Sequence, residues 1–205
     1  MQYNDLANKN SLEKTKTTLE KRGYVVTVVK DGKAALEEIK NTIPSDSSIM
    51  NGSSVTLEQI GFIDYLKSGE HKWNNLHGAI FAEKDPEKQA LLRKQALSSD
   101  YYLGSVHALS EKGEFVVASN TGSQLSHVVF SSPNLIFVVS TKKIVPNLES
   151  ALKRLEEHVV PLENQHMMEK YNMGTTLNKI VIFKGESPMM GRKVKFILVE
   201  EDLGF

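Results

Sequence analysis

Segments in which apolar residues follow a helical spacing alternate along this chain with segments of extended, strand-like pattern. Residues 5–22 predict a polar amphipathic helix, because three leucines fall on one face and a glycine follows as a stop signal. Residues 24–30 are rich in β-branched side chains and predict a strand, and residues 32–40 return to helical spacing. The chain therefore opens as helix, strand and helix.

The next segment predicts a short strand followed by two helices. Residues 47–54 form the strand, which ends in a loop of small residues. Thr56 is predicted as a helix N-cap, with Gln59 completing a capping box, for a helix that runs to residue 69. An Asp-Pro pair then opens a helix over residues 86–97.

The second half of the chain centres on residues 135–140, which are almost uniformly apolar, as expected of a central strand covered on both faces. The other predicted elements are extended segments over 99–119 with a turn at 111–113, a loop entering a helix over 120–130, a helix over 148–160, and strands over 179–185 and 194–201. Strands alternating with helices predict an α/β fold with a mainly parallel sheet and helices on both faces.

Composition narrows the classes of function. The 205 residues suit one domain over 1–205, with the N-terminal helix packed on it. Lys and Arg total 25, equal to Asp and Glu, so we expect no nucleic-acid partner. The absence of cysteine excludes disulfides, thiolate nucleophiles and iron–sulfur ligation by the chain's own side chains. No signal peptide or membrane-spanning run is evident, so we expect a cytoplasmic protein without a membrane partner.

Candidate chemistry lies in loops that follow strands, because ligands of parallel α/β sheets bind at the carboxyl ends of strands. The loops are 51–56, 104–108, 119–126 and 140–146. Their backbone amides and hydroxyls could hold a carboxylate or phosphate. The alternative is ordinary turn and capping chemistry. The candidate ligand-binding residues in the first three loops are Ser53, Ser54, Thr56, Gly104, Ser105, Asn120, Thr121, Gly122 and Ser123, and Lys143 is the candidate in the fourth.

Few catalytic signatures accompany these loops. His107 is a candidate acid, base or metal ligand, although a half-buried structural imidazole is the commoner case. Glu58 and Glu111 could act as base or nucleophile, although solvated surface carboxylates are the default. The sequence has no HExxH, GxGxxG, Walker or GxSxG motif, so it predicts no metal and no cofactor. Lys142, Lys143 and Lys179 are expected to be exposed.

Three stretches of the sequence resemble a known family. They are residues 100–163, beginning DYYLGSVHALSEKGEFVVASNTGS, the segment MNGSSVTLEQIG, and the tail KIVIFKGESPMMGRKVKFILVEEDLGF. Together they are similar to the LUD domain, the lactate-utilisation family once treated as a domain of unknown function. The resemblance implies a NagB/RpiA/CoA-transferase-like fold. It marks Ser54, Thr56, Glu58, Gly104, Glu111, Gly113, Gly122 and Lys143 as motif positions.

The resemblance also implies an association with lactate oxidation and with iron–sulfur partner proteins. Gln124 stands where longer relatives often have arginine, so the loop is expected to supply amides and hydroxyls more than charge. We therefore expect an accessory domain that binds a small anionic metabolite. The alternatives are an isomerase or acyl/CoA-transferase-like enzyme that uses Glu58 or Glu111, and a structural partner of an iron–sulfur complex. A homo-oligomer is a further expectation.

Overall fold

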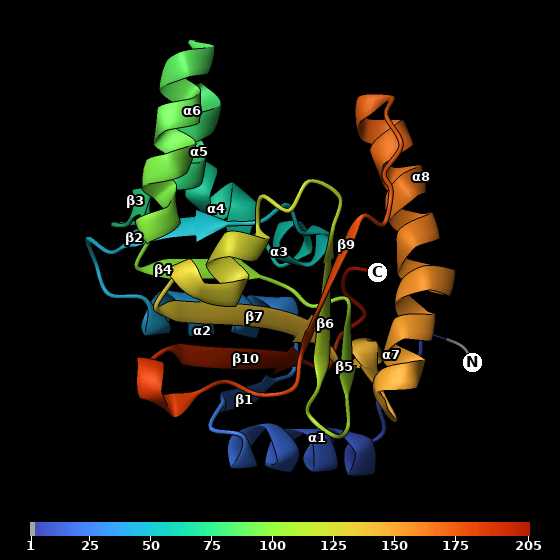
Figure 1. The fold of residues 1–205 in the computed structure, drawn as a ribbon. Helices are drawn as coiled ribbons and strands as arrows, with labels where there is room; N and C mark the ends of the chain where they lie inside the picture. The colour runs from blue at the N-terminus through green and yellow to red at the C-terminus, as the bar shows by residue number, and fades with distance from the viewer. Residues whose placement is uncertain (1–2) are drawn as a thin grey trace.

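The computed structural model describes residues 3–205 and is built on a six-stranded sheet in which all paired strands run parallel (Figure 1). The apolar segment predicted as a central strand lies third in the order, as expected. Along the sheet the strands are β1 (Val25–Val29), β10 (Lys193–Val199), β7 (Asn134–Ser140), β4 (Tyr101–Gly104), β2 (Ser48–Asn51) and β3 (Asn74–Asn75). The α/β class with a mainly parallel sheet is confirmed.

The side chains of β7 divide between two hydrophobic clusters because successive residues of a strand point to opposite faces. Leu135, Phe137 and Val139 enter one cluster, while Ile136 and Val138 enter the other. The second cluster is closed by helices α2 (Gly32–Thr42), α3 (Val55–Gln59) and α4 (Phe62–Ser68). The first is closed partly by α1 (Lys9–Lys21).

A second, four-stranded sheet completes the cover of the first cluster. Its order is β8 (Ile144–Val145), β5 (Ala108–Ser110), β6 (Phe115–Ser119) and β9 (Lys179–Phe183). The pairs β5–β6 and β6–β9 are antiparallel. Phe115 joins the sheets, since its ring centroid lies 5.5 Å from that of Phe137 and 5.2 Å from that of Phe196. The sequence predicted extended segments at β5, β6 and β9, but it treated β8 as part of a loop and did not predict a separate sheet.

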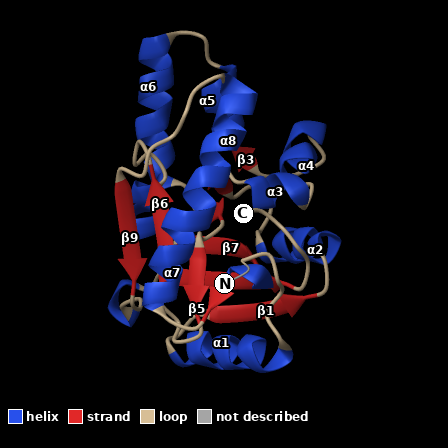
Figure 2. Cartoon of the chain, turned by 90° about the vertical axis from the view of Figure 1, so that its right-hand side faces the viewer, coloured by secondary structure: helices blue, strands red, loops and turns tan. Residues whose placement is uncertain are grey.

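One long helical segment covers the outer face of the second sheet (Figure 2). It comprises α7 (Leu148–Arg154), a π-helical turn (Leu155–Val159) and α8 (Val160–Tyr171). The helix predicted over 148–160 thus continues eleven residues further. Pro161 lies in the first turn of α8 and has no N–H group to donate to the preceding turn. That preceding turn is π-helical and therefore wider, which makes room for the proline ring.

Several other predicted helix boundaries also change in the structure. Helix α1 begins at Lys9 after the cap Asn8, not at residue 5. Thr56 is not an N-cap, because Ser54 fills that position and accepts a hydrogen bond from the Leu57 amide. The helix predicted over 56–69 is broken at Gly61, whose left-handed backbone (φ 79°) separates α3 from α4.

Two further helices follow β3 along the chain. Helix α6 (Pro86–Gln95) is capped by Asp85 as predicted, whereas α5 (Leu76–Ala82), capped by Asn75, was not predicted. Within residues 3–205, no helix is both long enough and apolar enough to cross a bilayer.

Candidate functional site

A cavity of about 570 Å³ lies where β2 and β4 end and where the chain leaves β7. Parallel strands present their carboxyl ends at one edge of a sheet, so these loops meet there. Figure 1 shows α8 rising on one side of this edge and α5 with α6 on the other. All four predicted loops contribute to the lining, through Ser53, Ser54, Thr56, Gly104, Ser105, His107, Asn120, Thr121, Ser123 and Lys143.

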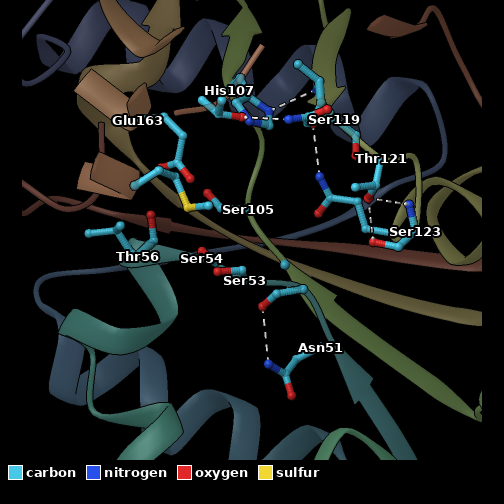
Figure 3. A pocket seen from close by; sticks show the side chains of 18 of the residues that line it. Asn51, Ser53, Ser54, Thr56, Ser105, His107, Ser119, Thr121, Ser123 and Glu163 are labelled. Atoms are coloured by element: carbon cyan, nitrogen blue, oxygen red, sulfur yellow. Dashed lines mark hydrogen bonds between the residues drawn. The ribbon is translucent and has the colours of Figure 1, made fainter. Parts of the chain in front are cut away.

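The polar side chains enter the cavity from opposite walls. Figure 3 shows Thr56 and Glu163 on one side and Thr121 and Ser123 on the other. Gly122 does not line the cavity, but its left-handed backbone (φ 89°) turns the chain between its two neighbours. Its neighbour-but-one Asn120 does not have a positive φ.

Lys143 is buried at one end of the cavity, contrary to the expectation that it is exposed. It ends the 3-10 turn Thr141–Lys143 that follows β7, and it is 4% exposed. Its Nζ donates hydrogen bonds to Thr56 Oγ1 (3.0 Å) and Ser105 Oγ (3.1 Å). Throughout the described chain, no carboxylate lies within ion-pair distance of this nitrogen. The cavity therefore contains a buried amine without an acidic partner.

Burial, with smaller contributions from the nearby cations Arg154 and Lys142, lowers the pKa of Lys143 from 10.5 to about 7. Arg154 is itself fully buried and donates from Nη1 to the His107 carbonyl (2.6 Å). Its Nε and Nη2 have no hydrogen-bond partner among residues 3–205. Lys142 pairs with Asp202 instead. The electrostatic character of this end of the cavity is thus positive.

The segment Leu203–Phe205 covers Lys143, and only glycine fits at its centre. Gly204 has a left-handed backbone (φ 67°), and its amide donates to Gln59 Oε1 (2.6 Å). A Cβ atom at this position would lie 2.3 Å from Thr56 Oγ1 and 2.9 Å from Lys143 Nζ. Gln59, predicted as part of a capping box, therefore holds this segment in place.

His107 lines the cavity as a neutral ring. Burial and the charges of Lys143 and Arg154 lower its pKa to about 3. Its Nδ1 accepts a hydrogen bond from the Ala118 amide (3.1 Å), so the ring proton resides on Nε2. His107 can therefore donate one hydrogen bond, but it is uncharged near neutral pH.

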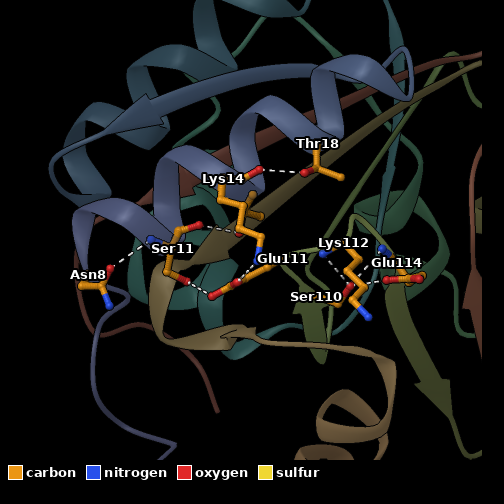
Figure 4. Close-up of polar contacts among 9 residues, drawn as sticks. Asn8, Ser11, Lys14, Thr18, Ser110, Glu111, Lys112 and Glu114 are labelled. Atoms are coloured by element: carbon orange, nitrogen blue, oxygen red, sulfur yellow. Dashed lines mark hydrogen bonds and ion pairs between the residues drawn. The ribbon is translucent and has the colours of Figure 1, made fainter.

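Glu58 and Glu111 both lie outside the cavity lining. Glu58 forms an ion pair with Lys170 (2.9 Å) on α8, and its side chain is 39% exposed. Glu111 accepts hydrogen bonds from Ser11 Oγ (2.6 Å) and Lys14 Nζ (2.8 Å), which fasten the β5–β6 turn to α1 (Figure 4). Their placement gives no support for a reaction in this cavity that uses either carboxylate.

Several further residues outside the predicted ligand-binding set also line the cavity. Gln124 donates from Nε2 to the Ala118 carbonyl (2.9 Å) and accepts from the Tyr102 hydroxyl (3.3 Å). The Tyr102 ring stacks on His127 at a centroid distance of 5.1 Å. The carboxylate that does line the cavity is Glu163, whose pKa is raised mainly by burial. These residues come from segments separated in sequence, so no local pattern groups them.

The described residues of the cavity do not form an evident metal-binding site. The part of the chain that the structure describes has no group of three or more His, Asp or Glu side chains placed to hold a metal ion. The cavity lining combines hydroxyls and amides with the Lys143 amine, the Arg93 guanidinium, the Glu163 carboxylate and the imidazoles of His77, His107 and His127.

The sequence and the fold were compared with protein families and with solved structures, and both comparisons found similar proteins. A family model described as the LUD domain matches residues 12–188. A crystal structure of a DUF162 family protein from Deinococcus radiodurans is similar, at 13% identity and a TM-score of 0.59, over 95% of this chain and 99% of that one. Ribose 5-phosphate isomerase A from Neisseria gonorrhoeae aligns at 15% identity and a TM-score of 0.38, over 77% and 76% of the two chains. No curated protein matches significantly.

Proposed function

The chain belongs to the LUD domain family and is thus related to lactate utilisation, and we propose that its cavity binds a small carboxylate or phosphate metabolite at Lys143. The observation that carries this proposal is the buried Lys143 amine, which has two hydroxyl partners and no carboxylate partner in residues 3–205. A buried ammonium without a counter-ion is costly, and an anionic ligand supplies that counter-ion.

The rest of the lining suits an anion of modest size. The volume of about 570 Å³ lies within the range, roughly 300–1,000 Å³, of small-molecule pockets. Hydroxyls of Ser53, Thr121 and Ser123 can donate to carboxylate or phosphate oxygens, and the His107 ring adds a neutral donor. Gln124 supplies hydrogen bonds without charge. Arg93 and Lys143 are the cationic side chains of the lining, and Lys143 is the buried one, on which the proposal rests.

Ligand binding is better supported than isomerase or acyl-transferase chemistry through a loop carboxylate. That alternative requires Glu58 or Glu111 close to the ligand. Both instead make ion pairs with surface lysines outside the cavity.

The proposed accessory role of this protein also involves binding to an iron–sulfur partner protein. A chain without cysteine cannot ligate an iron–sulfur cluster through thiolates, so any such cluster would belong to another protein. Affinity purification of the tagged protein from its native cells tests this part of the proposal. Enrichment of a cysteine-rich iron–sulfur protein is expected, and its absence from the bound fraction would count against an accessory role.

Calorimetric titration tests the ligand site directly. Lactate, pyruvate, inorganic phosphate, a sugar phosphate and coenzyme A are titrated into the wild type, Lys143→Met and Lys170→Met. We expect at least one anion to bind at millimolar concentration or tighter, with a loss of tenfold or more in Lys143→Met and no change in Lys170→Met. Lys170 lies outside the cavity and pairs with Glu58, so it is a matched control. Equal binding to all three proteins would refute the proposal.

A further inference from the structure

We propose that Lys143 is a nucleophile that forms an imine with the carbonyl group of a bound 2-oxo acid. This inference rests on the proposed anion site and adds a covalent step to it. It follows from the geometry of one side chain, since Lys143 lines the cavity and its nitrogen is held by two other lining residues, Thr56 and Ser105.

An amine attacks a carbonyl carbon only through its free lone pair. Ion pairing with a carboxylate would hold the amine protonated, and the described chain offers Lys143 no such partner. The two hydroxyls restrain the nitrogen without supplying negative charge. Lys143 is therefore positioned as a nucleophile rather than as half of a structural ion pair.

The surroundings also favour the neutral amine. Burial together with the charges of Arg154 and Lys142 brings the pKa of Lys143 to about 7. His107, whose pKa Lys143 and Arg154 help to lower to about 3, stays neutral near this pH. Covering by Leu203–Phe205 keeps bulk water from the amine. An appreciable fraction of Lys143 is thus unprotonated at neutral pH.

The reaction needs no reagent beyond the amine and the 2-oxo acid. The Nζ lone pair forms a bond to the carbonyl carbon, and one proton of the amine passes to the carbonyl oxygen, which becomes a hydroxyl. That hydroxyl leaves as water with the second amine proton, and a carbon–nitrogen double bond remains. Neither partner is oxidised or reduced, and hydrolysis reverses the step.

A 2-oxo acid fits better than a simple aldehyde because its carboxylate is attached to the reacting carbon. The Thr56 and Ser105 hydroxyls, which accept from Nζ at 3.0 and 3.1 Å, lie where they can donate to that carboxylate once the nitrogen has reacted. A protonated imine remains a cation, so it also retains the positive charge that faces the anion.

Borohydride trapping tests the inference. The wild type, Lys143→Arg and Lys170→Arg are incubated with pyruvate or lactate and treated with sodium borohydride, and the modified lysine is mapped by peptide mass spectrometry. Binding of both acids is measured in parallel by calorimetry. Arginine keeps a cation at position 143 but cannot form this imine, while Lys170→Arg changes a lysine outside the cavity.

A reduced pyruvate adduct on Lys143 in the wild type and Lys170→Arg supports the inference. No adduct should form with lactate, which has no carbonyl carbon to attack, or at position 143 of Lys143→Arg. Anion binding to the wild type without any adduct on Lys143 would overturn the imine and leave the proposed binding function intact. Absence of binding by every anion would refute the proposed function itself.

Discussion

Replacing Lys143 by methionine should make the protein more stable while removing its ligand site. The pKa of this lysine falls from 10.5 to about 7 on folding, and a tenfold change in protonation equilibrium corresponds to about 1.4 kcal/mol. Keeping the charged amine buried therefore costs the folded state on the order of 5 kcal/mol at low pH. Methionine has a similar length and carries no charge.

Two hydroxyls offset part of this gain. Thr56 Oγ1 and Ser105 Oγ lose their Nζ donor in Lys143→Met, at a cost of about 1 kcal/mol each. We therefore expect the free energy of unfolding to rise by about 2–3 kcal/mol at pH 6. The burial cost is fully present below pH 7 and is relieved as pH rises from about 7 toward 10.5, because the folded protein then buries a neutral amine.

Urea unfolding at pH 6 and pH 10 measures this effect in wild type, Lys143→Met and Lys170→Met. The advantage of Lys143→Met over wild type should shrink to zero or below at pH 10. Lys170 pairs with Glu58 on the surface, so Lys170→Met should change stability by less than about 1 kcal/mol at either pH. A difference between wild type and Lys143→Met that is the same at both pH values would refute the assignment of Lys143 as a desolvated amine.

Other predictions follow from the same contacts. Gly204→Ala should cost about 1–3 kcal/mol and expose Lys143 to an amine-reactive reagent, because the added Cβ would lie 2.3 Å from Thr56 Oγ1; unchanged labelling would contradict this. Glu111→Ala should lower the free energy of urea unfolding by about 1–2 kcal/mol through loss of its contacts to α1, without changing anion affinity by calorimetry. Glu58→Gln should leave both stability and anion affinity nearly unchanged, within about 0.5 kcal/mol. Affinity for lactate, which forms no imine, should weaken as pH rises above about 7, because the free protein then loses the Lys143 proton; a pH-independent lactate affinity between 6 and 9 would argue against this lysine.

Local pattern was sufficient for most of the elements. The apolar run of β7 predicted its central place, because a strand covered on both faces has no polar face to show. The hydroxyl-rich loops after β2 and β4 predicted the position of the cavity, because parallel strands end at one edge of a sheet. The sequence missed α5, the short strands β3 and β8, and the separate sheet that β8 forms with β5, β6 and β9. Which strands pair is decided by contacts distant in sequence.

The character of the cavity was decided by the tertiary structure. Lys143 looks like an exposed lysine at the end of a strand, yet its partner Thr56 lies 87 residues away and its cover comes from Gly204. Glu58 and Glu111 look equally available, yet α8 and α1 hold them outside. Residue order and periodicity determined where hydroxyls and strands occur. Whether a charged side chain stays hydrated depends on segments that are distant in sequence and pack around it. The desolvation of Lys143, which lowers its pKa, is therefore visible only in the tertiary structure.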